Sequence, residues 1–286
     1  MKKAINWWAF PAGLSYQETV GMAKDAGFEG IEPVLNEKGF FSLESPRSEF
    51  EYLRAEADAA RIELTSLATG LYWQYPFTSD DPDIRAKGVE IAKFQLNAAS
   101  WLGVDCILVV PGNIVSTATR ETALESYDVY YDRALDAVRS LIPEAEKTDV
   151  TIGIENVWNQ FLLTPREMKG FIDAAGSDKV ASYLDVGNMV LFGYPQQWVR
   201  TLGSRVKRVH CKDFKKSIGN FDGFVDLLAG DVDYPAVMKE LEAIGYDGWL
   251  IAEMGGYPRY ADQIVYNTSA AMDRILGRKG GRVCSR

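Results

Sequence analysis

Four residues with metal-binding side chains each close a short apolar run in the second half of the chain. The runs span residues 151–154, 181–184, 206–209 and 249–252, and the residues that follow them are Glu155, Asp185, His210 and Glu253. Carboxylates are rarely buried unless they are paired or bound to a metal, and the sequence holds a single histidine. Each residue taken alone is more often a helix cap, an ion-pair partner or a structural group. Their recurrence in consecutive units instead predicts one shared site.

One nitrogen and three carboxylates form a hard, oxygen-rich set of ligands. Such a set suits Mn²⁺, Mg²⁺ or Co²⁺ better than a structural zinc, which prefers cysteine and histidine, although ligand type does not exclude zinc. A divalent cation with open positions can hold a carbonyl together with a neighbouring hydroxyl and stabilise an enediolate. One divalent metal is therefore the expected cofactor.

Further polar residues stand at or near the ends of apolar runs. Glu32 is expected at the same edge as the metal site, where a contact with substrate and a structural ion pair are equally supported. Asn113 and Asn156 are candidates for binding hydroxyl groups, although asparagines in loops are also ordinary turn formers. Lys212 and Asp213 follow His210 directly, and we interpret them as a pair that orients it.

Aromatic residues gather after the first and third apolar runs: Trp7, Trp8, Phe10, Tyr72, Trp73 and Tyr75. Aromatic rings over a binding site can stack on the apolar face of a sugar and exclude water. We expect loop packing or a subunit contact for at least half of them, and we retain Trp73 as a substrate contact. The stretch 215–231 is long for a loop and is interpreted as a lid or as an irregular surface segment.

The elements that must position these residues alternate along the chain. Strands are expected at residues 4–7, 30–33, 63–68, 106–110, 151–155, 181–185, 206–210 and 249–253, with longer amphipathic segments between them. Eight such units indicate a parallel sheet and favour a (β/α)8 barrel, in which active sites lie at the carboxyl ends of the strands. Gly27 and Gly245 recur in similar helix-to-strand junctions, where a glycine can take the left-handed position that ends a helix.

Size and composition agree with one soluble domain. The chain has 286 residues, 47% of them hydrophobic, and a formal net charge of −9; a barrel of this kind needs about 250, so residues 1–276 are assigned to it and the basic tail 277–286 is expected to be disordered. The acidic charge argues against a nucleic-acid partner. Unpaired cysteine spacing and the lack of an apolar run long enough to cross a membrane favour the cytoplasm.

At the four strand ends the sequence resembles a known family. The segments Ile154-Glu155-Asn156, Tyr183-Leu184-Asp185-Val186-Gly187-Asn188, Val209-His210-Cys211-Lys212-Asp213-Phe214 and Ile251-Ala252-Glu253 are similar to those of the xylose isomerase-like barrels, in particular the branch of sugar and sugar-phosphate isomerases and epimerases that contains the ketose 3-epimerases. The resemblance implies that Glu155, Asp185, His210 and Glu253 bind a metal, commonly Mn²⁺. It also implies that Glu155 and Glu253 exchange the proton as an acid/base pair, that the substrate is a small carbohydrate, and that the protein is a homo-oligomer, a dimer or tetramer.

Three positions depart from the pattern of the ketose 3-epimerases. Asn188 stands where they carry a substrate-binding histidine, Phe161 where they carry a glutamate, and Lys216 where they carry an arginine. Asn188 can still bind a sugar hydroxyl but cannot carry a proton, and Lys216 can meet a hydroxyl or a phosphate as a point charge. The departures leave the metal ligands intact and the identity of the sugar open.

Other functions are compatible with the same barrel. A dehydratase or lyase acting on an inosose or a 3-keto sugar would use the same metal site to expel a hydroxyl group. A DNA-repair endonuclease of the superfamily is disfavoured, because those enzymes need several histidines. A non-catalytic subunit is disfavoured because all four expected ligands are present.

Overall fold

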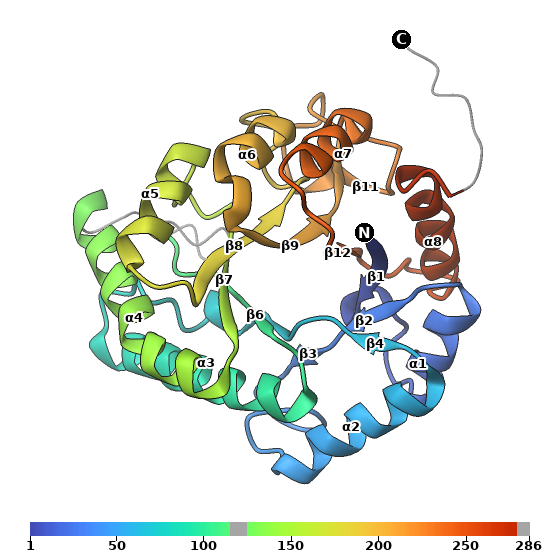
Figure 1. Cartoon of the computed structure of the whole chain (residues 1–286), viewed down its shortest axis with the longest axis horizontal. Coiled ribbons are helices and arrows are strands. Elements are labelled where there is room, and N and C mark those ends of the chain that lie inside the picture. The colour runs from blue at the N-terminus through green and yellow to red at the C-terminus, as the bar shows by residue number, and fades with distance from the viewer. Residues whose placement is uncertain (115–124, 279–286) are drawn as a thin grey trace.

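In the part of the chain that the structure describes, eight parallel strands form a ring that is surrounded by eight α-helices (Figure 1). The computed structural model describes residues 1–114 and 125–278. The strands of the ring are β1 (Lys2–Asn6), β2 (Gly30–Glu32), β4 (Glu63–Leu64), β6 (Cys106–Val109), β7 (Thr151–Glu155), β8 (Val180–Asp185), β9 (Val206–Cys211) and β12 (Trp249–Ala252). The helices are α1 (Tyr16–Asp25), α2 (Arg47–Ala60), α3 (Pro82–Leu102), α4 (Tyr127–Thr148), α5 (Pro165–Ala175), α6 (Pro195–Leu202), α7 (Tyr234–Ala243) and α8 (Gln263–Ile275). The predicted (β/α)8 barrel is confirmed.

The order of strands around the ring is β4-β2-β1-β12-β9-β8-β7-β6, and Leu67 closes it. The Leu67 backbone N–H donates to the Cys106 carbonyl at 3.0 Å, and the Leu108 N–H donates to the Leu67 carbonyl at 3.0 Å. The barrel strands are almost wholly buried, because their outer face packs against the helices and their inner face points into the barrel interior. This burial explains why they read as continuous apolar runs rather than as alternating ones.

The third expected strand, residues 63–68, is interrupted. Regular pairing covers only β4 (Glu63–Leu64), after which the Thr65 carbonyl accepts hydrogen bonds from the Arg208 guanidinium at 3.0 and 3.2 Å. The Thr65 N–H still donates to the Ile31 carbonyl of β2 at 3.1 Å, and the contact with β6 on the other side is the bridge at Leu67.

Short elements at the carboxyl ends of the strands build the rim of the barrel. β3 (Val34–Leu35) pairs with β5 (Ala68–Thr69), and β10 (Asp213–Phe214) pairs with β11 (Phe224–Val225) in an antiparallel hairpin. Gly27 and Gly245 adopt φ angles of +83° and +72°, as the repeated junctions predicted.

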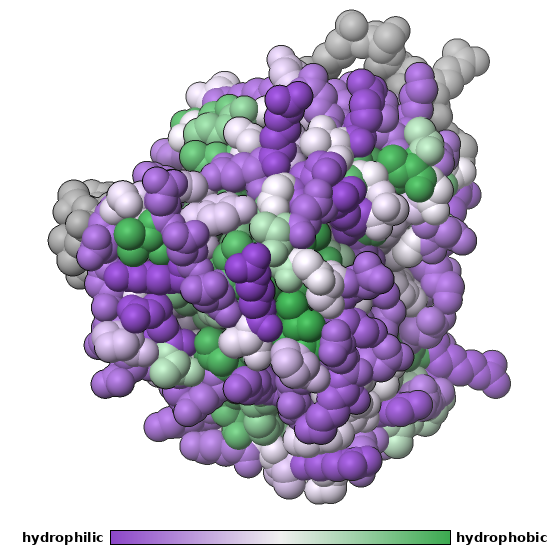
Figure 2. Space-filling model, turned by 60° about the vertical axis from the view of Figure 1, so that its left-hand side comes forward, coloured by the Kyte–Doolittle hydropathy of each residue, from purple (hydrophilic) through white to green (hydrophobic). Residues whose placement is uncertain are grey.

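The surface is largely hydrophilic, with small hydrophobic groups scattered over the face that Figure 2 shows. Within residues 1–114 and 125–278, no helix is both long and apolar enough to cross a membrane. At the start of the expected tail, the Arg278 guanidinium lies 2.5 Å from the Glu29 carboxylate. Residues 279–286 lie outside the described residues.

Candidate metal centre

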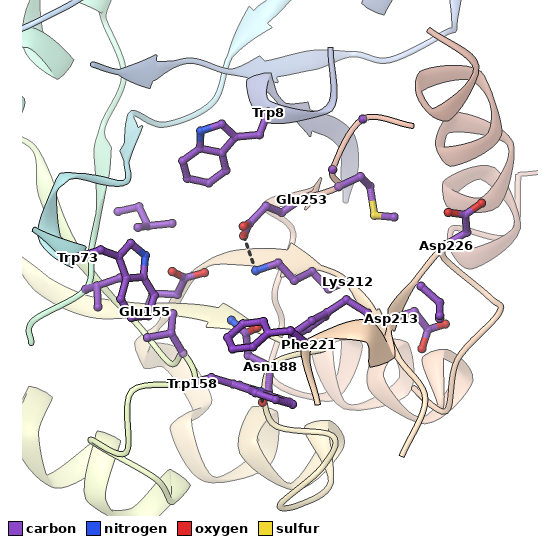
Figure 3. Close-up of a pocket in the computed structure, with 18 of the residues that line it drawn as sticks. Trp8, Trp73, Glu155, Trp158, Asn188, Lys212, Asp213, Phe221, Asp226 and Glu253 are labelled. Atoms are coloured by element: carbon purple, nitrogen blue, oxygen red, sulfur yellow. Dashed lines mark hydrogen bonds and ion pairs between the residues drawn. The ribbon is translucent and has the colours of Figure 1, made fainter. Parts of the chain in front are cut away.

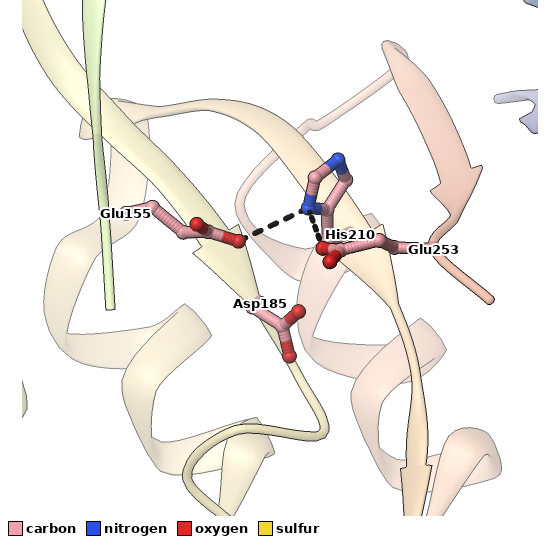
Figure 4. Close-up of side chains that lie close together, drawn as sticks. All are labelled: Glu155, Asp185, His210 and Glu253. Carbon is pink, nitrogen blue, oxygen red and sulfur yellow. Dashed lines mark hydrogen bonds and ion pairs between the residues drawn. The ribbon is translucent and has the colours of Figure 1, made fainter. Parts of the chain in front are cut away.

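The four residues at the ends of β7, β8, β9 and β12 converge on one point (Figure 4). These strands are neighbours in the ring, and Asp185 pairs directly with His210 in the β8–β9 register. One potential ligand atom from each of Glu155, Asp185, His210 and Glu253 lies within 4.8 Å of the other three. The interpretation of the four strand ends as one site therefore agrees with the geometry, and we refer to these residues as the four-residue cluster.

The imidazole of His210 presents one nitrogen to each side. Nδ1 lies 3.1 Å from Glu155 Oε1 and 2.7 Å from Glu253 Oε2, whereas Nε2 lies 2.8 Å from Glu32 Oε2. When Nε2–H is donated to Glu32 and Nδ1 has lost its proton, the lone pair of Nδ1 points into the cluster. A metal-binding histidine typically has this arrangement, with its second nitrogen held by a carboxylate.

Glu32 has a different position from the predicted contact with substrate. It is fully buried behind His210 and also accepts hydrogen bonds from Asn6 Nδ2 at 2.6 Å, Ser66 Oγ at 2.7 Å and the Tyr183 hydroxyl. Burial opposes its negative charge, but the charge of His210 and these donors outweigh burial and lower its pKa. Glu32 therefore holds His210 in place and does not line the cavity.

The pKa values of the two glutamates of the cluster are shifted in opposite directions. Burial raises the pKa of Glu155 to about 7, against the hydrogen bond from His210 and with the help of the Glu253 charge. Burial acts in the same way on Glu253, but Lys212 and His210 outweigh it and lower its pKa to about 2. Without a cation, Glu155 is therefore partly protonated near neutral pH while Glu253 is ionised.

Asp185 is oriented by the loop that follows its strand. Its Oδ1 accepts the backbone N–H groups of Gly187 at 2.8 Å and Asn188 at 2.7 Å. Among the described residues, Asp185 Oδ2 and Glu253 Oε2 are buried and accept no hydrogen bond of good geometry. The Lys212 ammonium lies 3.1 and 2.8 Å from them, and His210 Nδ1 lies 2.7 Å from Glu253 Oε2. Two buried carboxylate oxygens that make no well-formed hydrogen bond, beside a histidine nitrogen, are groups that fit a hard divalent cation.

A cavity of about 700 Å³ opens over the cluster at the carboxyl ends of the strands (Figure 3). Glu155, Glu253, Lys212 and Asn188 provide its polar groups nearest the cluster. Trp8 and Trp73 lie on one side of these groups, and Trp158 and Phe221 lie on the other. The cavity thus combines a charged floor with two aromatic walls, an arrangement suited to a polar molecule that also has apolar faces.

Two of the five predicted substrate contacts line the cavity, namely Asn188 and Trp73. The other three do not. Asn113 lies beyond the wall, where its backbone N–H and carbonyl both bond to the Thr78 hydroxyl, and the exposed Lys216 places Nζ 5.0 Å from the Tyr194 ring instead. The third, Glu32, is held behind His210. A strand-end position alone does not tell a cavity wall from the layer behind it.

Other residues near the site also have roles that differ from the prediction. Lys212 and Asp213 do not pair: the Lys212 ammonium meets the cluster, whereas the Asp213 carboxylate accepts the N–H groups of Phe214, Leu228 and Val232 and so fixes the rim. The Asn156 side chain bonds to both backbone groups of Asp185.

The aromatic residues divide between the cavity and loop packing. Of the six predicted candidates, Trp8 and Trp73 line the cavity, while Trp7 stacks on Tyr16 and Tyr72 is buried. A second aromatic group, which the sequence pattern did not indicate, also lines the cavity: Trp158, Phe221, Phe224 and Tyr257. Trp158 follows Glu155 by three residues, and that proximity was the available signal. The stretch 215–231 contributes Phe221 and Phe224 as part of the wall.

The sequence model of the family described as xylose isomerase-like TIM barrel matches residues 20–273. The chain belongs to this family. The L-ribulose-5-phosphate 3-epimerase of Salmonella typhimurium is 24% identical over 281 residues, which cover 94% of this chain and 92% of that protein. A crystal structure of D-psicose 3-epimerase from Clostridium cellulolyticum H10 superposes with a TM-score of 0.79 at 19% identity, covering 97% of this chain and 99% of the other. A 3-keto-D-glucoside 4-epimerase from E. coli gives a TM-score of 0.77 at 19% identity, with 96% and 99% covered. At these identities the structural matches establish the fold.

Proposed function

We propose that this family member is a sugar or sugar-phosphate epimerase or isomerase that depends on one divalent cation. Glu155, Asp185, His210 and Glu253 would hold the cation, with Mn²⁺ preferred over Mg²⁺ and Co²⁺. The single observation that carries the proposal is the convergence of these four side chains beneath a cavity with aromatic walls. The 3-epimerase names of its sequence relatives support the same reaction class.

Glu155 and Glu253 are proposed as the acid/base pair. Both carboxylates line the cavity, and they come from β7 and from the residue after β12, with β8 and β9 between these strands. Such a pair can remove a proton from one face of the carbon next to a carbonyl and return it to the opposite face. Two carboxyl groups at one cavity are the kind of groups that general acid and base catalysis needs.

The cation, when bound, would act as a Lewis acid that polarises the carbonyl of the sugar and makes the neighbouring C–H bond more acidic. The protein's own contribution is to hold the reacting carbon and to exclude water. Asn188 offers an amide to a hydroxyl group, although its Nδ2 also donates to the Asn156 carbonyl at 3.0 Å. The indole rings of Trp8, Trp73 and Trp158 offer surfaces for the apolar face of a sugar.

Solvent isotope exchange tests this function. Ketoses and ketose phosphates are incubated with the protein and Mn²⁺ in D₂O and followed by proton NMR. Epimerisation is expected to place one deuterium on the carbon next to the carbonyl and to yield two epimers. Product formation without deuterium would exclude proton transfer. Enone absorbance with keto-inositols or 3-keto sugars, without epimers, would favour the dehydratase or lyase reaction instead.

We also propose a cytoplasmic homo-oligomer, a dimer or tetramer. Cys106 and Cys211 are free and buried, as expected in a reducing compartment. Light scattering of the purified protein measures the oligomeric state directly, and a monomer would contradict this part of the proposal.

A further inference from the structure

Lys212 is placed by its strand at the boundary between the four-residue cluster and the cavity. Side chains alternate along a strand, so Lys212 extends from the end of β9 on the same face as His210, two residues nearer the mouth. Its ammonium lies 3.1 Å from Asp185 Oδ2 and 2.8 Å from Glu253 Oε2, and the side chain lines the cavity. A substrate oxygen that approaches these two carboxylates therefore also approaches Lys212.

Several contacts hold this lysine in place. The Tyr234 hydroxyl donates to the Lys212 carbonyl at 2.8 Å, and Nζ lies 5.8 Å from the centre of the Phe224 ring. Gly187 packs against it so closely that a Cβ there would lie 2.5 Å from Lys212 Cβ. A long flexible side chain fixed in this way loses little further freedom when it binds a ligand, which favours a functional position.

Lys212 also changes the balance of charge around the cavity. Among the described residues that line the cavity, Lys212 is the only cationic side chain, and four of the others are acidic: Glu155, Asp213, Asp226 and Glu253. A divalent cation alone would leave one negative charge on the three carboxylates of the cluster. The lysine offsets it, so that negative charge developing on a substrate would face a fixed positive donor rather than a net repulsion.

We propose that Lys212 is a further catalytic residue of the reaction proposed above, on which this inference rests. When a carboxylate removes the proton next to the carbonyl, the C–H electron pair forms the carbon–carbon double bond and the carbonyl oxygen gains the negative charge. The Lys212 ammonium donates a hydrogen bond to that oxygen or to the oxygen on the neighbouring carbon. The proton then returns to the opposite face, the carbonyl reforms, and Lys212 keeps its own protons throughout.

The test compares Lys212→Met with Lys215→Met, an exposed lysine on the same segment that does not line the cavity. Lys212→Met is expected to lower kcat by about 10²–10³-fold, as loss of one donor to a developing oxyanion does, with KM changing far less. Its Mn²⁺ content is expected to match that of Lys215→Met. A Lys212→Met protein that binds Mn²⁺ and keeps kcat within about threefold of wild type would overturn the proposal.

A second measurement separates this proposal from the proposed function. A hydroxamate that mimics an enediolate is titrated calorimetrically into the Mn²⁺-loaded proteins, and Lys212→Met is expected to bind it at least about tenfold more weakly than wild type. Equal affinity would refute a role for Lys212 even if no ketose were epimerised, whereas inactivity of the wild type alone would refute only the proposed function. If Lys212→Met does not fold, Lys212→Gln is put through the same two measurements and judged by the same two outcomes.

Discussion

Glu32 binds the histidine of the cluster from behind. Its Oε2 lies 2.8 Å from His210 Nε2, across 178 residues of sequence, and both side chains are fully buried. This contact fixes the orientation of the ring and leaves Nδ1 as the nitrogen that faces Glu155 and Glu253. The geometry of the four-residue cluster thus depends on a residue that does not line the cavity.

Glu32→Gln is expected to weaken Mn²⁺ binding by about 10–100-fold, because loss of a carboxylate behind a metal-binding histidine removes the charge that supports it. The amide oxygen can still accept the Nε2 proton, so the fold should persist. Calorimetric titration measures the affinity. Glu63→Gln, at an exposed position on β4, is the control, and equal affinities of the two variants would contradict the role given to Glu32.

Metal affinity is expected to rise with pH. The pKa of His210 is raised well above its usual value, because Glu32 and Glu253 outweigh the opposing effect of burial, and burial raises that of Glu155 to about 7. Both groups must lose a proton to bind a cation, so cation binding at a pH below these pKa values releases protons. In that range the affinity for the cation is expected to rise about tenfold per pH unit for each proton released. Titrations at about pH 6 and about pH 8, in buffers of different ionisation enthalpy, measure affinity and proton release. An affinity independent of pH would rule out this coupling.

Glu155→Gln and Glu253→Gln are each expected to reduce epimerisation by about 10²–10⁴-fold, the usual contribution of a general acid or base. Because each variant keeps one carboxylate, each should still exchange deuterium into one epimer and not into the other. NMR in D₂O detects this difference. Glu90→Gln, on the exposed face of α3, is the control, and a variant that exchanges both epimers at the wild-type rate would remove that residue from the acid/base pair.

Gly187→Ala is expected to destabilise the protein by about 1–3 kcal/mol, because the added methyl would lie 2.5 Å from Lys212 Cβ and 3.0 Å from its carbonyl carbon. Gly170→Ala provides a control of opposite sign. Gly170 lies within α5 with open space around its Cβ position, so alanine there should stabilise by about 0.5–1 kcal/mol. Chemical denaturation measures both changes, and equal stabilities would show that the tight packing at Gly187 relaxes without cost.

The barrel and the position of the four-residue cluster were predictable because they depend on local pattern. Buried parallel strands leave continuous apolar runs, and a polar residue that ends such a run lies at the carboxyl edge of the sheet whatever the loops do. The same rule failed for the third strand, whose Thr65 carbonyl accepts the Arg208 guanidinium of β9, a partner far along the chain. It also could not assign Glu32, which ends its strand just as the cluster residues do.

By itself, the sequence determined which side chains stand at the strand ends, because the period of a strand and the left-handed glycines at its junctions are properties of a few neighbouring residues. Only the tertiary structure decided that Glu32 supports His210, that Lys212 meets Asp185 and Glu253, and that Trp158 and Phe221 form a wall of the cavity. These relationships join segments that approach each other only when the ring of strands closes. The distances between them therefore depend on the packing of the whole barrel and not on any local pattern.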